Sequence, residues 1–300
     1  MSPNCVLVTG ISGFIGRSLI NQLRTNFPES KFLYISSITN ENKNIIKRRG
    51  GKIQPNSEQL KLLEEVDCLI LNGSKTPKNK EELLSNFDSN FEFLKNLLVT
   101  PFPNLTRIIH ASSMDVYEKS TILISENSDT STLDLYAKSK ITCERFLQEY
   151  CKSRSITFCN LRIGHVYGPG DEKYKKIIPN LYRHFINQEP IFLPENCSII
   201  NLNLIYVNDL IKIFVKLIEK REIPEILNAV NSRSIRLSEV ISIFENTFDK
   251  RVKPTAMINT SVSNYNYDGS VIRNWIDTDF QEMRVLIPEN RKYYEKSLSH

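Results

Sequence analysis

Short apolar runs and amphipathic segments alternate along the first half of the chain. The apolar runs predict buried strands, and apolar positions spaced three and four residues apart predict helices. We expect strands at 6–9, 31–36, 67–72, 106–112 and 156–162 and helices at 14–25, 80–98 and 135–152. This order is typical of a doubly wound α/β domain, in which helices cover both faces of a parallel sheet.

The first predicted strand runs into a turn that contains three glycines and opens the first helix. Glycines three residues apart permit a tight turn, close approach of a phosphate to the backbone, and close helix–strand packing. The helix N-terminus adds N–H groups and a positive dipole end, which favour a pyrophosphate. Glycine spacing alone is a weak signal, but this strand–turn–helix context favours a dinucleotide site over a plain turn. The loop residues expected at that site are Gly10, Ser12, Gly13, Phe14, Ile15 and Gly16.

After Gly164 the pattern changes to a loop-rich stretch, marked by Gly168-Pro169-Gly170 and by prolines 179, 190 and 194. A helix at 207–220 and a strand at 226–229 indicate a return to the first domain, whereas a helix at 237–247 and a loop-like segment at 255–269 belong to a smaller lobe. The expected division is a dinucleotide-binding domain over 1–165 with a return segment at about 201–230, and a discontinuous substrate-binding lobe of 166–200 and 231–300.

Composition and charge bear mainly on the partners. The chain has 300 residues, 40% of them hydrophobic, which suffices for one large core or two lobes. Its net charge of +5 suits an anionic small substrate. The basic cluster Lys47-Arg48-Arg49 with Lys52 is interpreted as a solvated loop, because nucleic-acid binding needs a longer stripe with interleaved aromatics. We therefore expect no nucleic-acid partner.

The six cysteines form no C-x-x-C pair and have no histidine at ligand spacing, so no metal site is expected. Cys5, Cys68 and Cys159 lie in apolar runs, where a small buried thiol is the usual explanation. No apolar stretch is long enough to span a membrane, and no leader precedes the first strand. A reducing, cytoplasmic location without membrane attachment is expected.

Tyr136 and Lys140 lie four residues apart in the predicted helix 135–152, so their side chains share one helix face. A nearby cation lowers the pKa of a tyrosine, which can then exchange a proton with a carbonyl oxygen during hydride transfer. On spacing alone, an ordinary surface pair is the favoured interpretation. Ser113 follows the strand 106–112, at the sheet edge where ligands of open α/β sheets bind, and its hydroxyl can hold the substrate oxygen beside Tyr136.

The glycine turn, Ser113, Tyr136-x-x-x-Lys140 and the segment from Leu161 to Gly170 together resemble the extended short-chain dehydrogenase/reductase family, and specifically its nucleotide-sugar epimerases, dehydratases and reductases. The resemblance covers about residues 4–230 and is weak beyond them. It implies a Rossmann fold, catalytic roles for Ser113, Tyr136 and Lys140, and a bond from Lys140 to the nicotinamide ribose. Further cofactor contacts implied, beside the glycine loop and Ser36 and Ser37, are Asn72, Gly73, Ser74, Asn90, Ile163 and Val166.

Several positions depart from the family pattern. His165 stands where the family often has Asn, and we expect either a substrate-facing hydrogen-bonding group or a simple buried histidine. Asn201 and Leu202 stand where an Arg normally contacts phosphate, so Arg233, Arg236 or Arg273 become candidates for that contact on their charge alone. The candidate substrate residues are Lys75, Met114, Asp115, His165, Asn201 and Arg273.

Met114 and Asp115 stand where a 4,6-dehydratase has an Asp-Glu pair. Methionine cannot protonate a leaving hydroxyl, which disfavours a dehydratase; Asp115 is either an auxiliary base or a carboxylate that caps the next turn. The strand at 31–36 ends in Ser36-Ser37 instead of an acid, so a 2′-phosphate is not repelled there, and Lys43, Lys47 or Arg48 can supply charge. We therefore favour NADP(H) over NAD(H).

These features together favour a ketoreductase that acts on a nucleotide-linked 4-keto-6-deoxyhexose. A 4-epimerase is the close alternative, because it uses the same three catalytic residues. A non-catalytic NAD(P)-binding regulator is more distant, because such proteins typically lose the Tyr or the Lys. The helices 80–98 and 135–152 carry apolar residues beyond one stripe, and the resemblance implies a homodimer that pairs them in a four-helix bundle.

Overall fold

The computed structural model describes residues 2–37, 43–49, 51–73, 80–118, 123–132, 134–231, 233–258, 266–277 and 279–299, with only the backbone for 80–88. The chain forms two compact units. Unit 1 consists of Met1–Glu118, Ser128–Ile163 and Ile211–Asn228. Unit 2 consists of Lys119–Asn127, Gly164–Leu210 and Ala229–His300.

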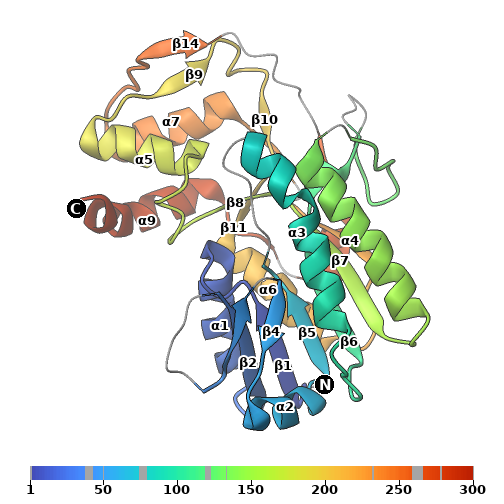
Figure 1. The fold of residues 1–300 in the computed structure, drawn as a ribbon. Coiled ribbons are helices and arrows are strands. Elements are labelled where there is room, and N and C mark those ends of the chain that lie inside the picture. Colours follow the sequence, from blue (N-terminus) through green and yellow to red (C-terminus); the bar gives the residue numbers. More distant parts are fainter. Residues whose placement is uncertain are drawn as a thin grey trace. The chain divides into compact units, whose positions relative to one another are not determined.

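Unit 1 is built on one large sheet (Figure 1). Its strand order is β12-β7-β6-β5-β1-β2-β3-β4. Its strands are β1 (Cys5–Thr9), β2 (Lys31–Ser36), β3 (Ile45–Arg49), β4 (Lys52–Gln54), β5 (Cys68–Leu71), β6 (Arg107–Ser113), β7 (Thr157–Ile163) and β12 (Ile226–Ala229). The pairs from β7 to β3 are parallel, and β3 and β4 are antiparallel. The predicted doubly wound parallel sheet is therefore confirmed, and the carboxyl ends of its parallel strands share one edge.

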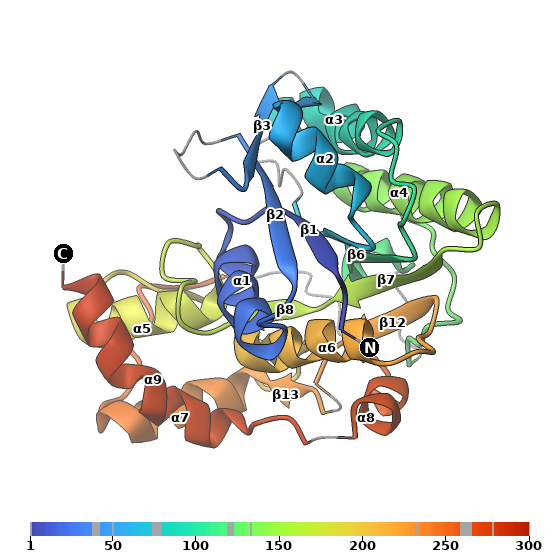
Figure 2. The same ribbon diagram turned by 90° about the horizontal axis from the view of Figure 1, so that it is seen from below.

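Helices cover both faces of this sheet (Figure 2). One face carries α2 (Ser57–Glu64), α3 (Lys80–Leu98) and α4 (Leu135–Lys152). The other face carries α1 (Phe14–Asn26) and the part of α6 (Val207–Glu219) that belongs to unit 1. Because both faces are covered, the central strands are apolar on both sides, which is why they read as continuous apolar runs in the sequence.

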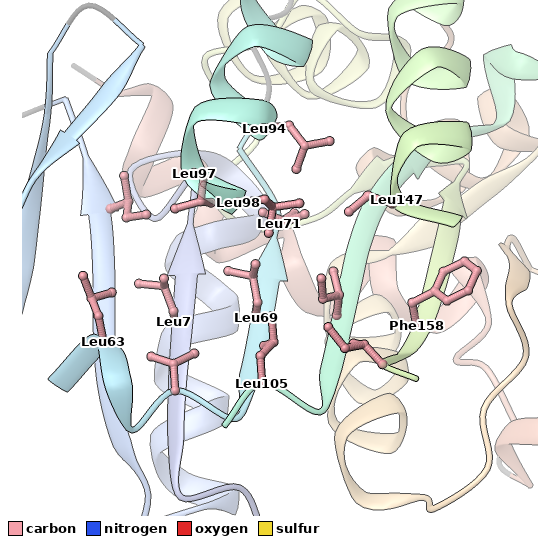
Figure 3. Packing of buried hydrophobic residues seen from close by; sticks show 14 of the residues in the cluster. Leu7, Leu63, Leu69, Leu71, Leu94, Leu97, Leu98, Leu105, Leu147 and Phe158 are labelled. Carbon is pink, nitrogen blue, oxygen red and sulfur yellow. The ribbon is translucent and has the colours of Figure 1, made fainter. Parts of the chain in front are cut away.

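An apolar cluster fills the space between the sheet and the helices α2, α3 and α4 (Figure 3). Leu97 of α3 and Leu147 of α4 belong to this cluster together with Leu7 and Leu69 of the strands, and none of the four is more than 1% exposed. Burying a leucine of this kind contributes about 1.5–3 kcal/mol. This cluster fixes the positions of α3 and α4 against the sheet.

The thiols expected in the strands are buried. Cys5, Cys68 and Cys159 are free and buried, which confirms the expectation. Burial raises the pKa of the Cys5 and Cys68 thiols to about 12, so both stay protonated and apolar. In the described ranges, no helix is long and apolar enough to cross a membrane.

The basic cluster forms a strand and not the solvated loop expected from the sequence. Lys47, Arg48 and Arg49 lie in β3, where successive side chains point to opposite faces. The Arg48 guanidinium lies 3.7 Å from the centre of the Phe93 ring, and burial lowers its pKa. The loop interpretation was wrong because the aliphatic part of an arginine can cover apolar surface while its cation stacks on an aromatic ring.

Unit 2 contains more regular structure than the sequence analysis predicted. Its elements are β8 (His165–Tyr167), α5 (Ile177–Asn187), β9 (Phe192–Pro194), β10 (Asn201–Leu202), β11 (Leu204–Tyr206), β13 (Ile235–Arg236), α7 (Leu237–Phe248), β14 (Ala256–Ile258), α8 (Ser270–Ile276) and α9 (Met283–Leu298). The stretch expected to be loop-rich contains α5. Pro179 lies in the first turn of α5, where the missing N–H has no acceptor within the helix in any case, so this proline does not break it.

Stacked aromatic rings form the core of unit 2. The Tyr182 ring lies 3.7 Å from the Tyr294 ring in a stacked arrangement and 4.7 Å from Phe244 edge to face. The Tyr294 hydroxyl donates to Asp171 at 2.6 Å, and burial raises the pKa of this carboxyl to about 6. These contacts join α5, α7 and α9 to the turn that begins at Gly168.

The role of α2 in the core can be tested with two leucines on the same helix. Leu63 is 1% exposed and Leu60 is 50% exposed. We expect Leu63→Ala to lower the free energy of unfolding by about 2–4 kcal/mol, because it leaves a cavity in the core. Leu60→Ala should change this free energy by less than about 0.5 kcal/mol. Urea unfolding followed by circular dichroism measures both; equal losses would contradict the packing of α2.

Candidate active site

The glycine turn joins β1 to α1, with Gly13 as the residue that precedes the helix. Gly10 has a φ of +71°, and a Cβ there would lie 2.5 Å from Cα of Gly73. A Cβ on Gly16 would lie 2.1 Å from the carbonyl oxygen of Gly10. A Cβ on Gly13 would meet only this oxygen, at 3.4 Å. Gly10 and Gly16 are therefore required by the close approach of backbone to backbone, whereas Gly13 is not.

The loop after β5 completes a cradle beside this turn. The Gly73 amide donates to the Thr9 hydroxyl at 3.0 Å. Oδ1 of Asn72 is buried and has no hydrogen-bond partner among the described residues. A buried acceptor left unpaired costs about 1–3 kcal/mol, so this atom is suited to a donor from a bound ligand. The residues present therefore fit a dinucleotide, with the helix N-terminus for its pyrophosphate.

At the end of β2, Ser36 is 8% exposed and Ser37 is exposed. Ser36 pairs in register with Lys47 of β3, so the two side chains lie on the same face of the sheet. Lys47 is exposed, whereas Arg48 is on the opposite face against Phe93. Of the three cations considered from the sequence, the structure thus places Lys47 beside the serine.

Ser113 is the last residue of β6 and caps the short turn that follows. Its hydroxyl donates to Oδ2 of Asp115 at 2.9 Å and accepts from the Asp115 amide at 3.2 Å. The side chain that caps the turn is that of Ser113, and the exposed Asp115 carboxylate accepts a hydrogen bond from the serine hydroxyl. Met114 is 4% exposed, so an apolar side chain is buried between these two residues.

Tyr136 and Lys140 lie in the first two turns of α4, which Asp134 caps by accepting from the Ala137 amide at 2.8 Å. Lys140 is 5% exposed, and its ammonium donates to the Ala111 carbonyl of β6 at 2.7 Å. The ammonium lies 5.9 Å from the centre of the Tyr136 ring. Burial lowers the pKa of Lys140 to about 8, so the ammonium is charged at neutral pH but titrates near it.

His110 lies on β6, next to the Ala111 carbonyl that accepts from Lys140. Its Nδ1 is 2.9 Å from Oδ1 of Asn160. Burial and the charge of Lys140 lower the pKa of His110 to about 3, so the imidazole stays neutral at physiological pH. No group of three or more His, Cys, Asp or Glu residues that could hold a metal occurs in the described part of the chain.

The sequence analysis assigned no role to Glu144 and Arg162, which form a buried ion pair below Lys140. Nε and Nη2 of Arg162 donate to the two carboxylate oxygens of Glu144 at 3.1 and 2.7 Å. The Arg162 side chain is 5% exposed and the Glu144 side chain is 7% exposed. A signal was present in the sequence, because Tyr136, Lys140 and Glu144 continue the spacing of four along one helix face.

Among the other expected cofactor residues of unit 1, Asn90 is half-buried on α3 and Ile163 ends β7 with 8% exposure. Ser74 and Lys75 lie outside the described residues. The predicted cofactor and catalytic residues of unit 1 that the structure describes therefore lie in two kinds of place. They follow or end the strands β1, β2, β5, β6 and β7, or they lie on the helices α1, α3 and α4.

The remaining candidates lie in unit 2. His165 is exposed in β8, so the alternative of a simple buried histidine was wrong, whereas Val166 beside it is buried. Asn201 donates to Oδ1 of Asn266 at 2.9 Å, and Arg273 is exposed on α8. Their roles toward a substrate remain predictions.

The chain, with its glycine turn and its Ser113, Tyr136 and Lys140, can be compared with known protein families. The model of the NAD dependent epimerase/dehydratase family matches residues 6–230 of the chain. The chain belongs to this family. Apart from Cys5, the match covers the strands of unit 1 and the glycine turn, which confirms the resemblance found in the sequence.

Curated relatives in the epimerase/dehydratase family are enzymes that act on nucleotide sugars. A trifunctional UDP-glucose 4,6-dehydratase/UDP-4-keto-6-deoxy-D-glucose 3,5-epimerase/UDP-4-keto-L-rhamnose-reductase of Arabidopsis thaliana is 23% identical over 252 residues, which are 75% of this chain and 37% of the relative. An ADP-L-glycero-D-manno-heptose-6-epimerase of Brachyspira hyodysenteriae is 27% identical over 195 residues, 61% of each chain. The chain thus aligns with little more than a third of the plant relative.

A solved structure shares the fold. The UDP-N-acetylglucosamine 4-epimerase of Methanobrevibacter ruminantium M1, in complex with UDP-N-acetylmuramic acid, superimposes with a TM-score of 0.83 at 20% identity. The superposition covers 99% of this chain and 100% of that one. At this identity the likeness concerns the fold.

The close approach at Gly16 gives a prediction for the turn. Gly16→Ala places a methyl group against the Gly10 carbonyl, and we expect it to lower the free energy of unfolding by about 2 kcal/mol or more. Gly13→Ala is the matched control, because its methyl group meets the same oxygen at an ordinary contact distance of 3.4 Å. Urea unfolding measures the difference; equal stability of the two variants would contradict the packing of this turn.

Proposed function

We propose that this protein is an NADPH-dependent reductase of a nucleotide-linked 4-keto-6-deoxyhexose. The observation that carries the proposal is the pairing of Ser36 with Lys47 at the end of β2. A hydroxyl and an ammonium at this edge can bind a 2′-phosphate, and no carboxylate of β2 repels it. An enzyme that draws on NADPH and releases NADP consumes reducing power, which suits a reductase.

The described side chains of unit 1 can do the proton chemistry that such a reduction needs. The bound cofactor supplies the hydride that adds to the keto carbon. We assign to Ser113 the orientation of the keto oxygen, for which its O–H must turn from Asp115 toward the substrate. Tyr136 then gives its phenolic proton to the keto oxygen, which becomes the hydroxyl of the product. The nearby Lys140 ammonium stabilises the remaining phenolate until solvent returns the proton.

The environment of Met114 supports a reductase over a dehydratase. Met114 is buried next to Ser113, and a thioether cannot donate a proton to a leaving hydroxyl. Asp115 is a carboxylate, but its described partner is the Ser113 hydroxyl. Elimination of water would therefore lack the acid that it requires.

A 4-epimerase is the second candidate. It needs the same Ser113, Tyr136 and Lys140, and the Methanobrevibacter neighbour and the Brachyspira relative both bear the name of an epimerase. The Arabidopsis relative includes a 4-keto-sugar reductase in its name. The two candidates differ in stoichiometry, because an epimerase returns the hydride to the sugar.

In an assay with NADPH and a nucleotide-linked 4-keto-6-deoxyhexose, we expect one NADPH to be oxidised per sugar reduced, measured by the near-ultraviolet absorbance of NADPH. Tyr136→Phe should lower kcat by about 100-fold or more, because it removes the proton donor. Tyr150→Phe, a change of the same kind on the same helix, is the control and should leave kcat unchanged. Interconversion of two sugars without net NADPH oxidation would replace the reductase by the epimerase.

The choice of NADPH over NADH depends on Lys47 in this proposal. We expect Lys47→Glu to raise the Kd of NADPH about tenfold or more and to leave the Kd of NADH nearly unchanged. Lys61→Glu, an identical charge change on the exposed side of α2, serves as the control. Isothermal titration calorimetry measures both constants for the native protein and for each variant; equal losses for both dinucleotides in Lys47→Glu would show that Lys47 does not contact the 2′-phosphate.

We further propose a homodimer formed by α3 and α4. Phe91 of α3 and Phe146 of α4 are half-buried and meet edge to face, with 5.5 Å between ring centres. Tyr150 continues this aromatic row along α4, 6.2 Å from Phe146. A half-exposed aromatic row along two adjacent helices suits pairing with a second copy into four helices.

Phe146→Asp tests the dimer, because it introduces a charge into the proposed interface. We expect the native protein to have twice its chain mass at micromolar concentration and the variant to be monomeric. Leu60→Asp, at an exposed apolar position of α2, is the control and should stay dimeric. Light scattering coupled to size exclusion gives the masses; a monomeric native protein would refute the proposal.

A further inference from the structure

The Lys140 ammonium is buried, and the partner that it contacts is uncharged. It is 5% exposed and donates to the Ala111 carbonyl. A buried cation without a nearby anion loses its proton far below its ordinary pKa. The role proposed for Lys140 requires the charged form, so some group must supply negative charge to it.

Among the described residues around Lys140, one group supplies that charge. On its own helix it faces Tyr136, Cys143 and Glu144, and from β6 it faces His110, which is neutral. Cys143 as a thiolate would favour the ammonium, but burial raises the pKa of this thiol to about 11, so it is uncharged wherever Lys140 titrates. Glu144, one helical turn further along α4, is the remaining anion, and its charge raises the pKa of Lys140 against the effect of burial.

Two neighbouring strands hold the Glu144 carboxylate in place. The Ser112 hydroxyl of β6 donates to Oε1, and the Arg162 guanidinium of β7 binds both oxygens in a two-pronged bond. Ser112 and Arg162 are register partners in the β6–β7 pair, so their side chains lie on the same face of the sheet. The Arg162 guanidinium lies 4.6 Å from the Tyr117 ring, which restricts its position as well.

Consecutive residues of β6 therefore hold successive turns of α4. Ala111 holds Lys140, Ser112 holds Glu144, and Ser113 carries the hydroxyl assigned to the substrate. We propose that Glu144, clamped by Ser112 and Arg162, is a positioning residue that keeps Lys140 protonated beside Tyr136. This inference rests on the proposed function only for what the charged Lys140 does in catalysis. The effect of Glu144 on the Lys140 ammonium does not require a substrate.

The informative variant is the double substitution Glu144→Gln/Arg162→Met. Glu144→Gln alone leaves Arg162 buried without a counter-charge, which destabilises the fold for an unrelated reason. The double variant removes both charges and keeps a similar volume, so folding is expected to survive. Glu149→Gln, the same charge change at an exposed position of α4, is the matched control, and Glu144→Asp preserves the charge.

The pKa of Lys140 is measured directly by NMR titration of ¹³Cε-labelled lysines in the ligand-free protein, with the Lys140 signal assigned from its loss in Lys140→Arg. In the double variant we expect this pKa to fall from about 8 to about 7.5 or below, because Glu144 acts on Lys140 from the same helix, whereas the Arg162 cation that is lost with it lies on the neighbouring strand β7. It should stay close to its native value in Glu149→Gln and Glu144→Asp.

Activity supplies a second measurement. The alkaline limb of kcat/KM should move to lower pH by the same amount in the double variant, since activity is lost as Lys140 loses its proton. An unchanged Lys140 pKa in the folded double variant would overturn the inference. The failure of the reductase assay would leave the NMR result standing, so the two proposals fail separately.

Discussion

A carboxylate and a guanidinium, buried together, connect the helix that carries the candidate catalytic residues to the two strands beside it. Glu144 extends from α4, and Arg162 reaches it from β7. Removing two charges from water is expensive, and a buried ion pair often adds little net stability over an apolar pair of the same size. Breaking one partner costs about 3–5 kcal/mol, however, so the pair permits one position of α4 and penalises the others. Position, more than stability, is what such a pair provides.

At the glycine turn, the backbone is positioned by steric fit instead of charge. Gly10, Gly16 and Gly73 bring three backbone segments closer than any Cβ allows. The result is a helix N-terminus directly beside the loop after β5, with the buried Asn72 oxygen at its edge. At the end of β2, the buried Ser36 lies beside the exposed Lys47 of β3, and β2 itself carries no carboxylate. Close backbone packing and local charge are therefore set by different residues of the same sheet edge.

Local patterns were sufficient for most of unit 1. Parallel strands buried on both faces are continuous apolar runs, and the helices between them are long and periodic, so strand and helix positions at 31–36, 80–98 and 135–152 agree with the structure. The short strands β3 and β4 were missed, because β3 carries three consecutive cations, of which Arg48 packs on the ring of Phe93. In unit 2, prolines were taken as breaks, although Pro179 occupies a helical position that tolerates it.

The sequence by itself determined the fold class, the family and the candidate groups for chemistry, because glycine spacing, strand–helix alternation and the Tyr136–Lys140 spacing are local properties of the chain. Only the tertiary structure decided which charges act together. The partners Ser112, Glu144 and Arg162 come from three separate elements, and the pairing of Ser36 with Lys47 depends on strand register. Burial, which lowers the pKa of Lys140 to about 8 and that of His110 to about 3, likewise arises only when distant segments pack around a side chain and exclude water.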